Sequence, residues 1–498
     1  MKQLALVMWF ACAAPAPVQP VAPVTWIAET ATYAPGTMAT TGSPAIADRY
    51  RGIAEKILAA ARDDRGGYRK LAELTDTIGH RLSGSSELDR AIAWAVATMK
   101  AEGFAVHTEK VMVPHWVRGA EEGAIVTPSA HAIRVLGLGM SVGTPRGGIT
   151  APIVVAHSWD ELDAMKDKVK GAIVLFNVAM PAYNPRAAGF DSTGYGKTVG
   201  YRARGAAKAA TYGAVGVLMR SVTARSIATL HTGAMSYREL PEGAAKIPAA
   251  TVTTEDAQLL ERLAQRGPVT FHLKLDDQLL PDVESANVVA DLVGKDKPDE
   301  LVVIGGHLDS WDVGQGAIDD GAGCVTMMQA IVLLKSLGLQ PRRTIRVVLW
   351  TNEENGVRGA TAYAEAHKSE LANTVMAVES DTGGGAPTGF SAGAADPAAS
   401  KRVVARVAQI ATLLQPLQAT RVIEAEGETD VAPMGPAGVA LVGLGHDVST
   451  YFDYHHTDAD TLDKVDPQTL ANGVAAMAVL AYVVADLPGR LSDPPPAP

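Results

Sequence analysis

Nine side chains of the types that bind metal ions follow predicted strands in the second half of the chain. They are His307, Asp309, Asp319, Asp320, Glu353, Glu354, Asp381, His455 and His456. In an open α/β sheet, ligands usually bind beyond the carboxyl ends of the strands. Imidazole nitrogen and carboxylate oxygen suit zinc, and one carboxylate can bridge two cations. The pattern therefore predicts a metal centre at one edge of a sheet, where an activated water attacks a substrate.

Neighbouring side chains in this set are expected to have different tasks. Of the adjacent Glu353 and Glu354, one would bind metal while the other takes the proton of the attacking water. Asp309 lies two residues from His307 and is expected to pair with its second ring nitrogen. A single His-x-Asp or Glu-Glu is more often a solvated surface feature. Their joint order beyond successive strands favours a metal, because several buried carboxylates without a cation would be costly.

Composition excludes several other classes of protein. The 498 residues are 47% hydrophobic and 20% charged, which is ample for a buried core. The net charge of -10 argues against nucleic acid or an anionic membrane as the main partner. Only two cysteines occur, Cys12 and Cys324, so a cysteine-based zinc site is excluded. Any metal must use the histidines and the carboxylates.

The elements that must position these side chains alternate between strands and helices. The predicted strands are the apolar runs 286–293, 300–307, 344–350, 374–380 and 438–445. Helices are expected over 320–337 and 400–414, and Asp466 with Pro467 should open a final helix that ends near residue 487. This alternation predicts an α/β fold whose mixed, mostly parallel sheet lies between layers of helices.

Further segments divide the chain into domains. Residues 1–16 resemble a signal peptide, 17–46 form a Pro/Ala/Thr-rich arm, and 491–498 form a disordered tail. Helices start near Ala47 and Ser86. Residues 125–280 have their own rhythm of short strands and helices and are expected to form an inserted α/β domain, which leaves 47–124 and 281–490 for the catalytic domain. Beyond the N-terminus, no segment is expected to cross a membrane.

The motifs resemble those of a known family. "GGHLDSWDVGQGAIDDGAG", "TNEENGVRGA", "ESD" and "HHTDADTL" are similar to successive motifs of the co-catalytic zinc aminopeptidase and glutamate carboxypeptidase family. "KGAIVLFN", "GAAKAATYGAVGVLMR" and "IPAATVTTEDAQLL" resemble the protease-associated domain that such enzymes carry. The resemblance implies the zinc exopeptidase fold with that domain inserted, two zinc ions per chain and a homodimer.

The resemblance also implies residue roles. Asp319 would bridge both zinc ions, His307 and Asp381 would complete one site, and Glu354 and His456 the other. Glu353 would be the general base and Asp309 the partner of His307, with a non-proline cis peptide bond after Asp319. The register of "HTDADTL" favours His456 over His455 as the ligand. Candidate substrate contacts are Asp430, Tyr454, His455 and His231.

The expected function is that of an exported zinc exopeptidase, periplasmic or extracellular. It would hydrolyse dipeptides or short peptides by attack of a metal-bridging water, from either the amino or the carboxyl end. Two alternatives stay open: a single-zinc acyltransferase like glutaminyl cyclase, and a non-catalytic binding or receptor homologue. No nucleic acid and no stable membrane span are expected.

Overall fold

The computed structural model describes residues 46–184, 193–425 and 427–494. The segment resembling a signal peptide and all of the predicted arm except Ile46 lie outside these residues. Ile46 begins the first helix.

The first sheet contains the strands that the predicted metal ligands follow. Its eight strands lie side by side in this order: β1 (Ala105–Val117), β10 (Gln278–Leu292), β12 (Arg343–Trp350), β11 (Lys297–His307), β13 (Thr374–Glu379), β16 (Ala440–His446), β14 (Pro387–Gly393) and β15 (Arg421–Glu424). The central strands β12, β11, β13 and β16 are parallel. The strands β1, β10 and β14 add antiparallel pairs, so the mixed sheet is confirmed.

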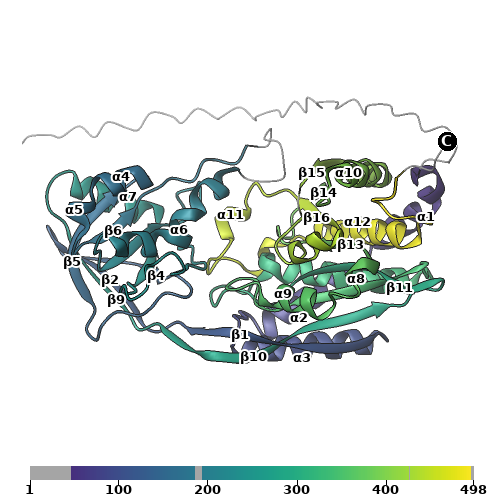
Figure 1. The fold of residues 1–498 in the computed structure, drawn as a ribbon, viewed down its shortest axis with the longest axis horizontal. Coiled ribbons are helices and arrows are strands. Elements are labelled where there is room, and N and C mark those ends of the chain that lie inside the picture. The colour runs from purple at the N-terminus through teal and green to yellow at the C-terminus, as the bar shows by residue number, and fades with distance from the viewer. Residues whose placement is uncertain (1–45, 185–192, 426, 495–498) are drawn as a thin grey trace, which may run out of the picture. The chain divides into compact units, whose positions relative to one another are not determined.

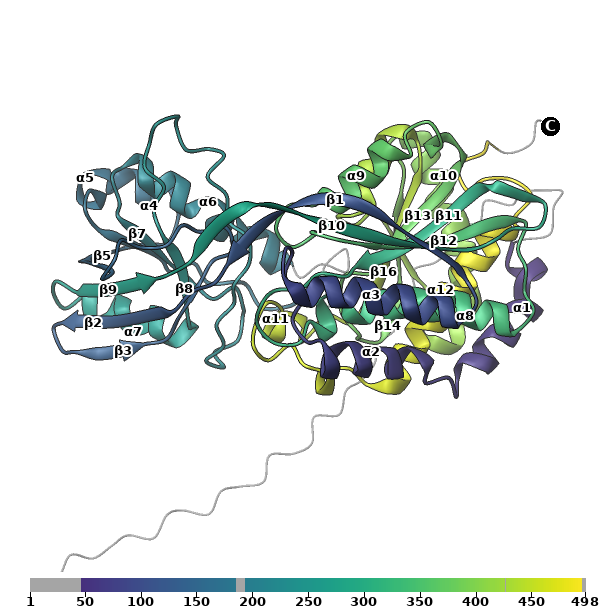
Figure 2. The same ribbon diagram turned by 90° about the horizontal axis from the view of Figure 1, so that it is seen from below.

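Helices cover both faces of this sheet (Figures 1 and 2). They are α1 (Ile46–Ala61), α2 (Gly66–Thr77), α3 (Ser86–Ala101), α8 (Ala322–Ser336), α9 (Arg358–Ala366), α10 (Pro397–Ala411) and α12 (Pro467–Asp486). The short helix α11 (Tyr451–Tyr454) lies beyond the end of the sheet (Figure 1). Successive residues of β11 alternate between two apolar cores. Val302 and Ile304 pack in the core formed with α1, α8, α10 and α12, whereas Leu301 and Val303 pack on the side of α9.

A second eight-stranded sheet is formed by residues between β1 and β10. Its order is β3 (His131–Ile133), β2 (Glu121–Thr127), β9 (Thr270–Leu275), β5 (Ile149–Ala156), β6 (Ile173–Phe176), β7 (Gly216–Arg220), β8 (Ala249–Val252) and β4 (Val135–Gly137). The helices α4 (Trp159–Ala164), α5 (Lys166–Val169), α6 (Thr193–Thr211) and α7 (Thr254–Ala264) accompany it. The sheet spans 121–275, whereas the sequence placed the borders of the inserted domain at 125 and 280.

Two expectations about the chain need correction. Helical segments 317–336 and 467–486 do have the length and hydropathy of membrane spans, but most of each is buried inside the protein. The disordered tail does not begin at residue 491, because Leu491 is fully buried. Arg406 donates to the carbonyls of Arg490 and Leu491 at 2.7 and 2.6 Å, which holds this end of the chain in place.

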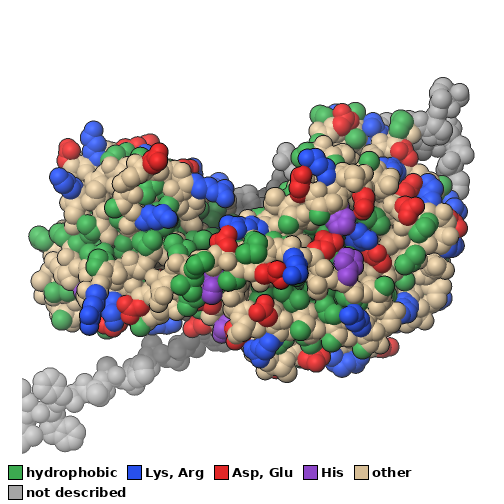
Figure 3. All heavy atoms as spheres, turned by 60° about the horizontal axis from the view of Figure 1, so that its bottom comes forward, with side chains coloured by type: hydrophobic (Ala, Val, Ile, Leu, Met, Phe, Trp, Pro, Cys, Tyr) green, Lys and Arg blue, Asp and Glu red, His purple; other side chains and the backbone are tan. Residues whose placement is uncertain are grey.

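Charged side chains are mixed on the surface. On the face shown in Figure 3, lysine and arginine alternate with aspartate and glutamate and do not gather into a basic patch.

Two glycines let the end of β11 approach its surroundings closely. A Cβ on Gly305 would overlap the Val348 carbonyl and the Trp350 ring, and a Cβ on Gly306 would overlap the carboxylate of Asp320. That carboxylate accepts the N–H of His307 at 3.2 Å. The two glycines therefore place the first histidine of the motif against the following loop.

We predict that Gly305→Ala lowers the free energy of unfolding by about 1–3 kcal/mol, because the added methyl group has no space beside a backbone carbonyl. The matched substitution Gly52→Ala on α1, where an added Cβ meets nothing within 4 Å, should raise it by roughly 0.5–1 kcal/mol. Guanidinium chloride unfolding followed by circular dichroism measures both. Equal effects of the two substitutions would contradict this account of the glycine.

Candidate metal centre

A cavity of about 450 Å³ lies beyond the carboxyl ends of the central strands. Its lining includes Asp319, Glu353, Glu354, Asp381, Glu428, His455, His456, Tyr451 and, from the second-sheet region, Tyr195 and Arg202. Arg202 is the cation among these lining residues, beside five carboxylates. The cavity is therefore strongly acidic.

His307 lies between two carboxylates. Its Nε2 is 3.3 Å from Asp319 Oδ1 and 3.2 Å from Asp381 Oδ1. Its Nδ1 is 2.9 Å from the backbone carbonyl of Asp309 and 3.9 Å from the carboxylate. The predicted pairing of His307 with Asp309 thus uses the main chain of Asp309 and not its side chain.

His456 has a matching arrangement with the second oxygen of the same aspartate. Its Nε2 is 3.1 Å from Asp319 Oδ2 and 3.0 Å from Glu354 Oε2. The neighbouring His455 is stacked on it, and its Nε2 is farther away, at 3.6 Å from Asp319 Oδ2. Asp319 therefore directs one oxygen toward each histidine, which is the geometry of a bridging carboxylate.

These distances fit zinc. Two ligand atoms held at about 2.0–2.1 Å from one zinc in a tetrahedron lie about 3.4 Å apart. Asp319 Oδ2 and Glu354 Oε1 are buried and accept no hydrogen bond in the described part of the chain, which is costly without a cation. Donor atoms of His307, Asp320 and Asp381 also cluster, but Asp320 accepts the N–H groups of His307 and Gly323 at 3.2 and 3.0 Å. Both carboxylate oxygens of Asp320 are therefore occupied by backbone N–H groups.

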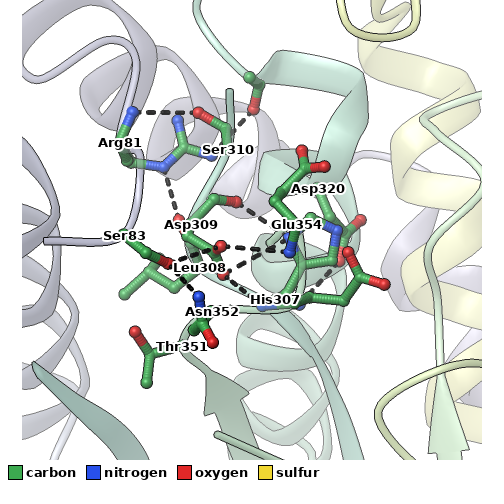
Figure 4. A network of polar contacts seen from close by, with 12 residues as sticks. Arg81, Ser83, His307, Leu308, Asp309, Ser310, Asp320, Thr351, Asn352 and Glu354 are labelled. Carbon is green, nitrogen blue, oxygen red and sulfur yellow. Dashed lines mark hydrogen bonds and ion pairs between the residues drawn. The ribbon is translucent and has the colours of Figure 1, made fainter. Parts of the chain in front are cut away.

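Asp309 connects the loops that carry the glutamates and the first histidine (Figure 4). Its carboxylate accepts the N–H groups of Glu353 and Glu354 at 3.1 and 3.4 Å and the hydroxyl of Ser83 at 3.1 Å. It is fully buried. It therefore fixes the start of the loop after β12 relative to the loop after β11. The peptide bond between Asp319 and Asp320 is cis, as the family resemblance implies.

Arg81 holds the loop between His307 and Asp319 and was not singled out from the sequence. Its guanidinium is buried and donates to the carbonyls of Leu308, Gln315 and Gly316 at 2.7, 2.8 and 3.0 Å. The only feature of the sequence that could have pointed to Arg81 was its position inside the segment "IGHRLSGS". Asp460 fixes the end of the same loop, because its Oδ1 accepts the N–H groups of Ala317 and Ile318 at 2.9 and 2.8 Å.

Burial and crowding of like charges shift the titration of the acidic groups. Burial, followed by repulsion from Asp381 and Glu354, raises the pKa of Glu353 well above its usual value. Burial and Asp381 raise the pKa of Glu428 to about 7. Burial also raises the pKa of Asp430 to about 8. Without a cation, the cavity therefore retains protons that ordinary carboxyl groups lose.

The four candidate substrate contacts lie in different places. His455 lines the cavity, whereas His231, Asp430 and Tyr454 are not among its lining residues. His231 is buried beside the His455 segment, and burial lowers its pKa to about 3. Tyr451, three residues before Tyr454, lines the cavity in its place. Arg358 braces the fold instead of facing the cavity, since it donates to the Met112 carbonyl at 3.2 Å.

The second-sheet region contributes residues that the sequence did not reveal. Arg202 and Tyr195 of α6 line the cavity, and Arg202 donates to the Tyr195 hydroxyl at 2.8 Å. The Nε of Arg202 is buried and has no hydrogen-bond partner among the described residues. Neither residue belongs to a motif with a recognisable metal-binding spacing, so no sequence signal distinguished them.

Known proteins resemble this chain over most of its length. Residues 287–481 match peptidase family M28. The chain is 41% identical to carboxypeptidase Q of Mus musculus over 443 residues, which cover 88% of this chain and 90% of the relative. It is also 41% identical to carboxypeptidase Q of Homo sapiens over 422 residues, covering 84% and 85%.

Solved structures extend the comparison. The peptidase M28 precursor of Shewanella amazonensis SB2B is 36% identical, with a TM-score of 0.82, and the match covers 90% of this chain and all of that one. An aminopeptidase from Aneurinibacillus sp. strain AM-1 shares the fold at 20% identity, with a TM-score of 0.61 over 88% of this chain and 98% of that one. The 41% identity to carboxypeptidase Q of Mus musculus over most of both chains and the structural match to the peptidase M28 precursor lead to the same family. The chain therefore belongs to peptidase family M28 and is a metallopeptidase.

Proposed function

We propose that this metallopeptidase binds two zinc ions and hydrolyses short peptides. His307, Asp319 and Asp381 would hold one ion, and Glu354, His456 and the other oxygen of Asp319 the second. The single observation that carries this proposal is that Asp319 turns one oxygen to each histidine and that each histidine faces a second carboxylate, with histidine-to-carboxylate separations of 3.0 to 3.3 Å. The relatives named carboxypeptidase Q accord with an exopeptidase.

Glu353 is the proposed general base. The zinc ions, when bound, would lower the pKa of a water molecule and polarise the scissile carbonyl. Glu353 lies in the lining of the cavity, next to the ligand Glu354, and its N–H is fixed by Asp309 at 3.1 Å. Its carboxylate would take the proton of the attacking water and pass it to the leaving amine. Asp309 acts by positioning both glutamates.

Arg202 supports removal of residues from the carboxyl end. A free peptide carboxylate entering a cavity with five carboxylates needs a cation, and Arg202 provides a guanidinium with an unpartnered buried Nε. The cavity volume of about 450 Å³ suits a dipeptide or another short peptide. A dipeptide or other short peptide with a free carboxyl end is therefore favoured as substrate over a peptide whose carboxyl end is blocked.

Three further properties complete the proposal. We infer that the second-sheet region is a protease-associated domain inserted into the catalytic domain, because it has its own eight-stranded sheet between β1 and β10 and its motifs resemble that domain. Export remains a prediction from residues 1–16, which lie outside the described part of the chain. Homodimer formation remains a prediction from the family resemblance.

Glu353→Gln should lower kcat/KM for dipeptides by about 10²–10⁴-fold, because the amide cannot accept the proton. The Glu353→Gln protein should still bind two zinc ions per chain, as measured by inductively coupled plasma mass spectrometry. The control Glu365→Gln removes an exposed carboxylate of α9 and should leave both quantities unchanged. Unchanged turnover by Glu353→Gln would rule out the base, and one tightly bound zinc in the unsubstituted protein would favour the cyclase-like alternative.

Arg202→Gln should raise KM for dipeptides with a free carboxyl end by about 10–100-fold, the value of a charge-assisted hydrogen bond. Dipeptides with an amidated carboxyl end should be poor substrates of the unsubstituted protein, and Arg202→Gln should not raise their KM further. Arg204→Gln, which removes a half-exposed cation from the same helix, is the control. Efficient hydrolysis of amidated but not amino-blocked dipeptides would show trimming from the amino end instead.

The metal-free protein should lose stability as pH rises from 5 to 8. Glu428 and Asp430 have raised pKa values of about 7 and 8, so the folded state holds protons that the unfolded chain releases near pH 4. Each such proton changes the unfolding free energy by up to about 1.4 kcal/mol per pH unit. In denaturant unfolding of metal-free Glu428→Gln, the free energy of unfolding should fall less steeply with rising pH than in the unsubstituted protein. An identical slope would contradict the assignment to Glu428, and stabilisation by added zinc should grow with pH.

A further inference from the structure

The two histidines of the centre are oriented by different parts of the chain. The second nitrogen of His307 faces the Asp309 carbonyl, two residues away in its own loop. The second nitrogen of His456 lies 3.3 Å from the carbonyl of Thr232, between β7 and β8. The Thr232 N–H in turn donates to the His456 carbonyl at 3.0 Å. One residue of the second-sheet region therefore contacts both the ring and the backbone of His456.

The proton on the His456 ring must face Thr232. A histidine that binds metal through Nε2 carries its hydrogen on Nδ1, and the acceptor of that hydrogen sets the orientation of the ring. Arg202 also lies 3.4 Å from Nδ1, but a guanidinium has no acceptor, so the Thr232 carbonyl takes this hydrogen bond. The same carbonyl accepts from Arg202 at 3.2 Å.

Arg118 fixes the side chain of Thr232. It lies between β1 and β2, at the entry to the second-sheet region, and is largely buried. It donates to Thr232 Oγ1 at 3.3 Å and to the Gly137 carbonyl at 2.8 Å. The Thr232 hydroxyl donates to the same Gly137 carbonyl at 2.8 Å. Arg118 and Thr232 therefore share one backbone acceptor.

The other side of Arg118 reaches the metal-binding loop. Its Nε and one terminal nitrogen donate to the two oxygens of Asp312 at 2.7 and 2.8 Å, which is a bidentate pair. Asp312 lies in the loop between His307 and Asp319. The neighbouring Trp311 is buried, and its ring leaves no room for a Cβ on Gly139. Both polar and apolar contacts thus join this loop to the second-sheet region.

We propose that the Thr232 carbonyl of the second-sheet region orients His456, and that the Arg118–Asp312 pair is the positioning device that holds Thr232 in place. The inference rests on the proposed two-zinc function. It makes the two histidines unequal, because the ring of His456 is oriented by a carbonyl of the second-sheet region and the ring of His307 by a carbonyl of its own loop.

The test compares Arg118→Lys and Thr232→Val with the full unsubstituted chain. Lysine keeps the charge but loses the bidentate fork, and valine keeps the shape but loses the hydroxyl. Chelator competition should show affinity for one of the two zinc ions falling by about 10–100-fold, with the other unchanged. Hydrogen exchange of the metal-free variants should be faster at the Thr232 amide and in the segment around His456. Thr232→Ser keeps the hydroxyl and should therefore show the zinc affinity and the hydrogen exchange of the unsubstituted protein.

Arg134→Gln is the control, since it removes an exposed ion pair at 3.6 Å between Arg134, of the same second-sheet region, and Asp458 near His456. It should change neither readout. Unchanged exchange and zinc affinity in both test variants would overturn the proposal, as would equal weakening of both ions. If the unsubstituted protein holds one zinc, the two-zinc function fails, and exchange in the metal-free protein still decides whether Arg118 and Thr232 hold the His456 segment.

Discussion

Buried negative charge is the constraint on which the site depends. Asp319, Glu353, Glu354 and Asp381 meet in one cavity with Glu428, and their mutual repulsion must be balanced when they ionise. The described lining of the cavity supplies one guanidinium, that of Arg202, and the imidazoles of His455 and His456, which is not enough positive charge for five carboxylates. The proposed divalent cations would resolve this imbalance, so the same groups that make the cavity unfavourable without a cation would give it affinity for metal. The proposed metal binding and the predicted instability of the metal-free protein would thus have the same origin.

Long-range contacts, and not the local helices and strands, fix the geometry of the centre. Arg81 reaches from the N-terminal helices to three carbonyls of the loop after β11, and Asp460 holds the other end of that loop from near the C-terminus. Asp309 joins this loop to the glutamates. In each of these contacts a charged side chain binds main-chain groups of a loop. The contacts therefore fix the path of the loop backbone as well as the side chains that it carries. The ligands are therefore held by a rigid frame whose parts come from distant points in the sequence.

The sequence was sufficient to predict the central strands, the final helix and the meeting of ligand-type residues at one edge, because parallel strands deliver their following residues to the same place. It missed β14 and β15, since Pro387, Gly389 and Gly393 are typical of loops and pairing with β16 makes the segment a strand. It predicted the partnership of Asp309 and His307 but not that the carbonyl makes the contact. It did not indicate Arg202, and it singled out His231 although the neighbouring Thr232 is the residue that contacts His456.

The contacts of the loop between His307 and Asp319 have a consequence for biosynthesis. Arg81 emerges from the ribosome long before this loop, whereas His456 and Asp460 emerge long after it. A growing chain therefore contains His307, Asp319, Glu354 and Asp381 before His456 has been made. The proposed centre can be completed only after residue 456 has been made, so a chain interrupted before it would lack one proposed ligand and would not be a smaller enzyme.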